Sequence, residues 1–291
     1  MNFLGGNNSK APLIVKLGGS ALDDPDARVE LWRALRELHA SLAGGLVLVH
    51  GGGGAVDRHL SRLGWTSERL DGLRVTPVEQ IDHVVAVLAG QVNKALVGAL
   101  NRCAGGSPAV GVCLGDGGMT QVEIATHPRG DLGRVGRITG GSGRLVAALL
   151  KAGFLPVVAS IGIDEGGKAL NVNADDAATG LAKIIGAAAL VLLTGVAGIK
   201  DEHGALIGRI DGAGIERLIE AGVIAGGMIP KARGAAAAAN QSGVPVVIAA
   251  WNEPRTLNAL AAGSGVGTRV VPSIAPAADA ARAHQTTEAT P

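Results

Sequence analysis

Two lysines that stand close to glycines are the residues best suited to chemistry in this chain. Lys16 is followed by Gly18 and Gly19, and Lys231 is preceded by the glycine pair 226–227. Glycines allow backbone N–H groups to approach a phosphate, and a lysine adds a compact positive charge. Taken alone, either loop is equally well explained as an ordinary turn with an exposed lysine.

A third glycine loop follows an apolar run. His50 precedes four consecutive glycines, which include Gly52 and Gly53, and a predicted helix follows them directly. Free N–H groups and the positive end of the helix dipole make such a loop an anion site. An HGGG run also builds the oxyanion hole of lipase-like hydrolases, but no serine here lies in a G-x-S-x-G pattern. We therefore interpret His50 as a packed or hydrogen-bonded loop residue, not as a catalytic base.

A cluster of polar residues, 171–176, stands at a predicted helix start. It contains Asn171, Asn173, Asp175 and Asp176, and Asn173 or Asp176 is suited to cap the helix. Each feature is weak by itself. Two lysines, three glycine loops and an aspartate on one framework together indicate a phosphate-handling site, because their coincidence by chance is hard to explain.

Neither common nucleotide fingerprint is present. The only Gly-Lys pair, Gly167-Lys168, is followed by Ala169, so the chain has no G-x-x-x-x-G-K-[ST] loop. No G-x-G-x-x-G follows a predicted strand. These absences exclude a P-loop enzyme and an ordinary NAD enzyme.

The composition favours a cytoplasmic α/β enzyme. Of the 291 residues 47% are hydrophobic and only 2% aromatic, so small aliphatic residues build the core, as suits helices packed on a parallel sheet. The net charge of +1 and the lack of aromatics argue against nucleic-acid binding. We expect no signal peptide and no membrane span. Cys103 and Cys113 fit no metal-ligand spacing, and reduced thiols are favoured over a disulfide between them.

Short apolar runs alternate with helical patterns, which predicts parallel α/β layering. Strands are expected at 13–15, 46–49, 109–113, 155–159, 189–193 and 244–249, and a hairpin or meander within 115–143. Helices are expected at 24–43, 55–63, 144–152, 175–185, 213–221, 231–242 and 254–262. Thr76 with Pro77 and Glu79 predicts a capping box that opens a long helix toward Arg102.

The domain organisation follows from these elements. Residues 1–12 are predicted to be flexible, 13–271 to form the folded domain, and 272–291, an Ala, Pro and Thr tail, to be disordered. We expect a boundary between two lobes, 13–174 and 175–271, because sites in open α/β sheets lie where halves meet beyond the strand ends.

Longer motifs indicate a family. The segments VKLGGSAL, LVHGGGG, DGLRVTP, LAGQVNKALV, VGVCLGDG, LPVVASIGI, LNVNADDAAT, GGMIPK and VGTRV run in this order from Leu13 to Val271. They resemble the acetylglutamate kinases of the amino acid kinase family, with GLRVT and NVNAD the most specific. The resemblance implies a three-layer αβα sandwich with a mainly parallel open sheet. It also implies ATP-dependent phosphorylation of the γ-carboxylate of N-acetyl-L-glutamate in arginine biosynthesis, with Mg²⁺ carried on the ATP phosphates and no dedicated metal site.

The resemblance assigns roles to matching residues. Lys16 and Lys231 match the pair that stabilises the transferring phosphoryl group, and Asp175 the residue that orients them. Arg74 matches the clamp for the substrate α-carboxylate, and Asn171 another substrate contact. Gly18, Gly19, Gly52 and Gly53 match backbone donors around the phosphates and the reacting carboxylate. The expected nucleotide-binding residues are Thr194, Gly195, Val196, Ala197, Gly198, Ile199, Lys200, Val223, Ile224 and Ala225.

Gly195 and Gly226 stand where the family usually has acidic residues, so two contacts expected on the nucleotide-binding side are missing from the match.

The match leaves two alternative functions open. A sister kinase for a longer acyl amino acid, of the acetylaminoadipate type, differs by one methylene, worth only about 1–3 kcal/mol in such a pocket. A non-catalytic sensor on the same fold is the other alternative, although every charged group that the chemistry needs is present.

The quaternary structure is also expected from the resemblance. Arginine-inhibited relatives resemble hexamers joined through an extra N-terminal helix, whereas about a dozen residues, including the poor helix former Gly5-Gly6, precede the first strand here. We expect a homodimer that arginine does not inhibit, with the long helix after Thr76 as an interface element.

Overall fold

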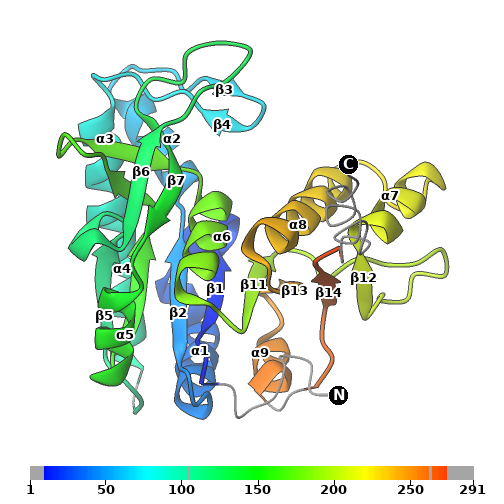
Figure 1. The fold of residues 1–291 in the computed structure, drawn as a ribbon. Coiled ribbons are helices and arrows are strands. Elements are labelled where there is room, and N and C mark those ends of the chain that lie inside the picture. Colours follow the sequence, from blue (N-terminus) through cyan, green and yellow to red (C-terminus); the bar gives the residue numbers. More distant parts are fainter. Residues whose placement is uncertain (1–9, 104, 262–263, 274–291) are drawn as a thin grey trace, which may run out of the picture.

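The computed structural model describes residues 10–103, 105–261 and 264–273. The predicted flexible segment before residue 10 and the predicted disordered tail after residue 273 lie outside these ranges. The described residues form a central sheet of eight strands in the order β12-β14-β13-β11-β1-β2-β8-β5 (Figure 1). All neighbouring strands pair in parallel except β13 and β14, which pair with each other antiparallel. The strands are β1 (Leu13–Leu17), β2 (Leu46–His50), β5 (Ala109–Cys113), β8 (Leu155–Ala159), β11 (Ala189–Thr194), β12 (Arg209–Asp211), β13 (Val246–Ala250) and β14 (Thr268–Val271).

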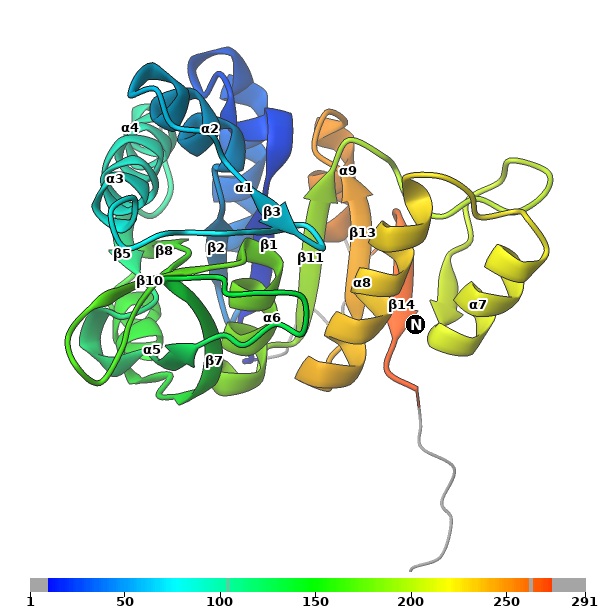
Figure 2. The ribbon, with the colours of Figure 1, turned by 90° about the horizontal axis from the view of Figure 1, so that it is seen from above.

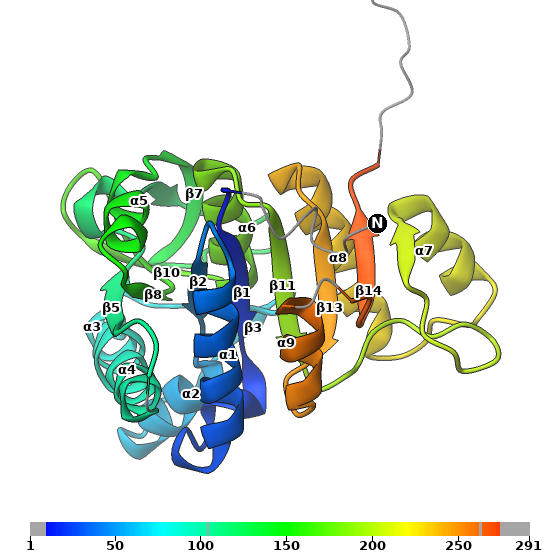
Figure 3. The ribbon, with the colours of Figure 1, turned by 90° about the horizontal axis from the view of Figure 1, so that it is seen from below.

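Helices cover both faces of this sheet, as Figures 2 and 3 show from opposite sides. They are α1 (Val29–Ser41), α2 (Gly53–Arg62), α3 (Ile81–Val85), α4 (Asn93–Arg102), α5 (Arg144–Lys151), α6 (Ala174–Ile185), α7 (Gly212–Glu220), α8 (Met228–Ser242) and α9 (Pro254–Ala261). Short 3₁₀ turns occupy Gly19–Leu22, Asp26–Arg28 and Asp116–Gly118. The αβα sandwich expected from the sequence is confirmed.

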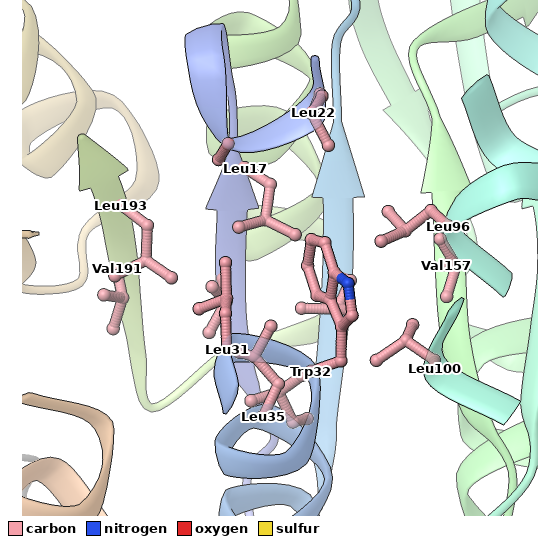
Figure 4. Close-up of a cluster of buried hydrophobic side chains, with 14 of the residues drawn as sticks. Leu17, Leu22, Leu31, Trp32, Leu35, Leu96, Leu100, Val157, Val191 and Leu193 are labelled. Atoms are coloured by element: carbon pink, nitrogen blue, oxygen red, sulfur yellow. The ribbon is translucent and has the colours of Figure 1, made fainter. Parts of the chain in front are cut away.

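Alternate residues of each strand pack against opposite layers, because side chains point to the two faces with a period of two. Val15 and Leu17 of β1 contact the layer formed by α1, α4 and α9, whereas Ile14 belongs to the layer of α6 and α8. Figure 4 shows the first of these clusters, with Trp32 of α1 and Leu100 of α4 over the sheet. Strands buried on both faces explain why the predicted strands read as continuous apolar runs.

A smaller sheet lies on one side of the main sheet. It has the order β6-β7-β10-β9, from β6 (Thr120–Ile124), β7 (Val135–Gly141), β9 (Ile161–Ile163) and β10 (Ala169–Val172). The antiparallel pair β6 and β7 confirms the hairpin predicted within 115–143. A short hairpin, β3 (Arg69–Leu70) and β4 (Leu73–Arg74), projects at the top in Figure 1.

The predicted capping box at Thr76 is wrong. The helix begins at Ile81, and Thr76 is fully buried in a parallel bridge with Gly133, where its backbone N–H donates to Leu132. A tertiary partner 57 positions along the chain takes the place of the local cap, and such a partner is invisible to a local motif. The long helix itself is confirmed, but residues Ala86–Val92 form a π-helical segment between α3 and α4.

By length and composition the stretch Ile81–Arg102 could cross a membrane, which the sequence analysis did not expect. In the structure Val84, Leu96 and Leu100 are fully buried against the main sheet. The apolar residues therefore cover the sheet, as in the core helix of a globular domain. Polar residues at 82, 83, 91, 93 and 94 interrupt the apolar run.

Candidate active site

Lys16 and Asp175 form an ion pair at the carboxyl end of the central strand β1. The distance from Lys16 Nζ to Asp175 Oδ1 is 2.9 Å, and the lysine side chain is only 16% exposed. Gly18 leaves room beside it, because a Cβ at this position would lie 2.8 Å from Lys16 Nζ and would displace the ammonium group. The pairing fixes the ammonium group at the point where the chain leaves the sheet.

Helix α6 places Asp175 in its first turn. The side chain of Asn173 caps this helix, accepting hydrogen bonds from the backbone N–H of Asp175 at 2.8 Å and of Asp176 at 3.3 Å. The predicted capping role of Asn173 is confirmed. Burial, with the adjacent charge of Asp175, raises the pKa of Asp176. The cap thus holds Asp175 in place beside Lys16.

The glycine loop after β2 takes a conformation that only glycine tolerates. Gly52 has φ +149°, and a Cβ there would meet Leu88 of the π-helical segment at 2.9 Å. Helix α2 begins at Gly53, so its first N–H groups lack intrahelical partners. They face the same region as Lys16 and make the loop suitable for an anion.

A buried hydrogen-bond network holds this loop from behind. His50, fully buried, donates from Nδ1 to the carbonyl of Gly51 at 2.7 Å, since a carbonyl can only accept. Its Nε2 then accepts from Asn93 Nδ2 at 3.0 Å, and the same amide donates to Val157 O at 3.0 Å. Lys94 Nζ donates to the remaining Asn93 oxygen at 3.0 Å. Burial above all, with the charge of Lys94, lowers the pKa of His50 to about 4. The ring is neutral and structural, as expected.

Arg74 stands at the end of β4 with its guanidinium almost fully buried. Its Nη2 donates to Gly53 O at 2.9 Å, and its Nη1 is bonded to Asp57 and Ser67. Arg69 Nη2 reaches the other Asp57 oxygen at 3.0 Å. Although partial burial raises it, hydrogen bonds from Arg74 and Ser67 and the charges of Arg74 and Arg69 lower the pKa of Asp57 to about 2. Asp57 therefore orients both arginines.

One hydrogen bond joins the two most specific motifs. Asn171 of β10 donates from Nδ2 to Thr76 Oγ1 at 3.0 Å, and Thr76 in turn donates to Arg74 O at 3.2 Å. The GLRVT and NVNAD segments, about a hundred residues apart in sequence, thus form one wall of the site.

A cavity of about 190 Å³ collects the residues predicted to bind the acyl amino acid. Its lining includes Lys16, Gly18, Gly19, Gly52, Gly53, Arg74, Asn171 and Asp175. A second cavity, of about 450 Å³, shares Lys16 and Asp175 with the first and adds Lys231 of α8 and Thr194 of β11. The two lysines therefore face one space, with the ion pair at its junction with the smaller cavity.

Eight of the residues predicted to bind the nucleotide line a third cavity, of about 620 Å³. Its lining includes Val196, Ala197, Gly198, Ile199, Lys200, Val223, Ile224 and Ala225. Gly195 lines none of these three cavities, and a Cβ placed on it would meet nothing within 4 Å.

Several residues at the site were missed from the sequence. Asp57 and Ser67 bond the Arg74 guanidinium, Arg69 bonds Asp57, and Arg69 and the buried Ser160 line the cavity. Asp57 could have been found, because it follows Gly53 by four residues and so shares its helix face. Ser160 gave no signal, since only the packing of the small sheet brings it to the cavity.

These features define a class. The model of the amino acid kinase family matches residues 11–250, and the chain belongs to this family. Among its relatives are the proteins named acetylglutamate kinase from Aeromonas salmonicida (strain A449) and Colwellia psychrerythraea. The first is 45% identical over 261 residues, 90% of this chain and 98% of the relative. The second is 42% identical over 262 residues, 90% of this chain and 97% of the relative.

Solved structures agree on the fold. An N-acetylglutamate synthase from Neisseria gonorrhoeae, complexed with coenzyme A and N-acetyl-glutamate, has a TM-score of 0.75 and 25% identity. The match covers 91% of this chain and 60% of that one. A carbamate kinase from Giardia lamblia bound to AMP-PNP has a TM-score of 0.60 at 20% identity, covering 92% of this chain and 100% of that one.

Proposed function

We propose that the protein transfers the γ-phosphoryl group of ATP to the γ-carboxylate of N-acetyl-L-glutamate, giving N-acetyl-L-glutamyl 5-phosphate for arginine biosynthesis. The observation that carries the proposal is the Lys16–Asp175 pair, which belongs to two adjoining cavities at once. One cavity holds Arg74 and Asn171, and the other holds Lys231. An acceptor and a phosphoryl donor can therefore meet at Lys16.

The chemistry fits this arrangement. The acceptor carboxylate is ionised at neutral pH, since a glutamate-like pKa is about 4.3, so no general base is needed. The difficulty is to bring one anion onto another, and cations aimed at the transferring oxygens reduce that barrier. We assign this role to Lys16 and Lys231, with Asp175 orienting Lys16. The N–H groups at the start of α2 face the reacting carboxylate.

We assign recognition of the substrate α-carboxylate to Arg74. The planar guanidinium binds a carboxylate bidentately, and it stays charged at all accessible pH values. Its contacts to Asp57, Ser67 and Gly53 engage Nη1 and Nη2, and none of these contacts uses its Nε–H. Asp57 would hold the arginine in position before the substrate binds.

The lobes divide the work in this proposal. Residues 13–174 would bind the acyl amino acid and 175–271 would bind ATP, with 196–200 and 223–225 along the third cavity. Within the described ranges no group of three or more His, Cys, Asp or Glu residues could hold a metal ion. Mg²⁺ would therefore ride on the ATP phosphates and water, where it neutralises phosphate charge.

We propose a cytoplasmic homodimer. Strand β5 is an edge strand of the main sheet, and we place the contact with a second copy on this side of the molecule. Helix α4 packs on β5 and lies beside this edge. The described cysteines, Cys103 and Cys113, are free thiols, as suits a reducing compartment.

The test is an ADP-release assay that offers N-acetyl-L-glutamate and N-acetyl-L-2-aminoadipate separately. The expected result is turnover with N-acetyl-L-glutamate and a kcat/KM about tenfold or more lower with the longer acid. A preference for the longer acid would move the assignment to the sister kinase. No ADP release with either acid would contradict the proposal and favour the non-catalytic sensor.

A further inference from the structure

A cavity of about 730 Å³ lies at the amino ends of β1 and β2, opposite the strand ends that carry the candidate active site. It is lined by the end of α1, the start of β1, helix α5 and the last residues of α6. Figure 3 views the molecule from the side on which α1 and α5 lie. None of its lining residues belongs to the three cavities of the candidate active site.

His39 supplies this cavity with a hydrogen-bond donor. The side chain is 94% buried, being only 6% exposed, and its Nδ1 accepts a hydrogen bond from the backbone N–H of Leu46 at 3.0 Å. Burial, with the nearby charge of Arg36, lowers the pKa of His39, so the ring is neutral. A neutral ring whose Nδ1 accepts must carry its hydrogen on Nε2.

No protein acceptor takes this hydrogen among the described residues. The hydrogen bond to Leu46 is the one that His39 makes through its ring there, and Nε2 is not sealed from solvent. The solvent space that His39 lines is this cavity. The Nε2–H group is therefore an unpaired donor at the wall of the cavity, and an anion or another acceptor would satisfy it.

The charges around the cavity have one sign. Lys10, Arg144 and Lys151 line it, and no Asp or Glu does. Within the part of the chain that the structure describes, none of the three has an ion-pair partner. Three cations around one concave space attract an anion more strongly than dispersed surface lysines do.

The rest of the wall is aliphatic. Leu42 of α1, Val146 and Leu150 of α5, and Ile184 and Ile185 of α6 supply it. A ligand for this wall needs apolar surface as well as charge, because mostly apolar pockets with a few polar groups are typical of small-molecule sites.

We propose that this cavity binds a small organic anion, whose carboxylate or phosphate group meets the His39 Nε2–H and the three cations and whose short aliphatic portion packs on Leu150 and Ile185. The site is separate from the active site. Helix α6 has one end at each, since Asp175 lies in its first turn and Ile185 is its last residue, about 15 Å further along the helix axis. Binding here should therefore not compete with the substrates.

Calorimetric titration of the full chain tests the proposal with four probes: hexyl phosphate, hexanoate, inorganic phosphate and hexan-1-ol. We expect saturable binding of at least one of the two alkyl anions, and these two arms distinguish phosphate from carboxylate recognition. Inorganic phosphate and hexan-1-ol should bind about tenfold or more weakly, since each lacks one half of the ligand. The proposal would be overturned if inorganic phosphate or hexan-1-ol bound as tightly as the alkyl anions, or if neither alkyl anion showed saturable binding.

Variants locate the binding. Arg144→Met combined with Lys151→Met should weaken the bound alkyl anion about tenfold or more, and Ala147→Trp should block the cavity. Lys183→Met, an exposed lysine on α6 outside the lining, is the matched control and should bind as the parent does. The substituted arginine and lysines are exposed, and circular dichroism checks that each variant folds.

Nuclear magnetic resonance gives a readout that does not depend on these variants. The imidazole nitrogen signals of His39 should shift on titration with the bound alkyl anion and stay shifted when N-acetyl-L-glutamate and an ATP analogue are added. Unchanged His39 signals, displacement by the substrates, or unaltered affinity in the double variant would each refute the site.

Discussion

Lys16 lines both the cavity that holds Arg74 and the cavity that holds Lys231, and its only ion-pair partner among the described residues, Asp175, lines both as well. Because the Asp175 side chain is 58% exposed, this pair contributes little to the free energy of unfolding, about 1 kcal/mol at most. The pair matters more for the orientation of the Lys16 ammonium group. Lys231 approaches the same space from another helix, so the two ammonium groups depend on each other's placement.

Removing either lysine should therefore damage the reaction and spare the fold. We expect Lys16→Ala and Lys231→Ala each to lower kcat by about 10²-fold or more, as loss of a transition-state donor does. The melting temperature should change little. Steady-state ADP release and thermal unfolding check the two halves, with Lys183→Ala as a surface control. Parent-like turnover in either variant would contradict the proposed mechanism.

His50 gives a residue-scale prediction about acid stability. Its pKa is lowered from 6.5 to about 4 in the fold, so the unfolded chain takes up the proton first. The stabilisation is fully present above pH 6.5 and is lost as the pH falls toward 4, and the shift corresponds to about 3 kcal/mol. In urea unfolding at pH 7 and pH 4.5, His50→Gln should lose less stability than the parent. Parallel losses would show that His50 is not the group responsible.

At the scale of elements, the start of α6 couples a helix cap to Asp175, the residue proposed to orient Lys16. Asn173 holds the N–H of Asp175, so the cap also sets where the carboxylate stands. Helix α6 contacts β1, β2, β11 and α8, so it packs on one face of the sheet across its three central strands. Small movements of its first turn would displace Asp175 from Lys16.

Asn173→Ala should expose this coupling. Loss of the cap is expected to cost about 1 kcal/mol of stability and to lower kcat, because Asp175 is no longer fixed. Asn173→Ser, which can still cap, should recover most of the stability. Urea unfolding and ADP release on both variants make the comparison. If serine and alanine behave alike in stability, the cap does not support the helix.

The loop after β11 offers a gain-of-contact test. Gly195 stands in open space and its backbone does not require glycine, since its φ lies outside the positive range. We expect Gly195→Asp to leave the melting temperature unchanged and to lower the KM for ATP by about twofold or more, on the scale of one recovered hydrogen bond. Gly208→Asp, at an exposed glycine that is also in open space and lines none of the three cavities, is a control for added charge. A higher KM for ATP would show that the loop has adapted to glycine.

At the scale of the whole molecule, the site exists because strand order differs from chain order. Strands β1, β11 and β2 are neighbours in the sheet although β11 follows β2 by more than a hundred residues. Parallel strands have their carboxyl ends on the same side of the sheet, so Lys16, the glycine loop and Thr194 meet there. Lys10, His39 and Lys151 gather at the amino ends of the strands for the same reason.

The same edge argument applies to assembly. Strand β5 has no neighbouring strand on its outer side among the described residues, where side chains of Asn101, Lys94 and Asp116 bond its backbone. A second copy would therefore pack against this side of the molecule. Sedimentation equilibrium should give the mass of a dimer. A hexamer in the parent would refute the proposed dimer.

Much of this protein was determined locally and could be predicted. Apolar runs predicted the strands of the αβα sandwich, and Asn173 was predicted to cap a helix, because these features depend on near neighbours in sequence. The lysines, glycine loops, Arg74 and Asn171 were identified by motif. The lobe boundary and the roles of these residues remain predictions that the experiments above address.

Only the tertiary structure decided how these pieces meet. Thr76 looked like a helix cap but bonds to Arg74 and Asn171, because a buried hydroxyl goes to whichever partners packing supplies. Asp57 and His50 depend on contacts across the chain, as does the His39 donor at the far edge of the sheet. The sequence by itself thus determined the elements and the chemical groups they carry. Strand order and side-chain packing determined which groups share a cavity, since distance in space is set by the whole fold.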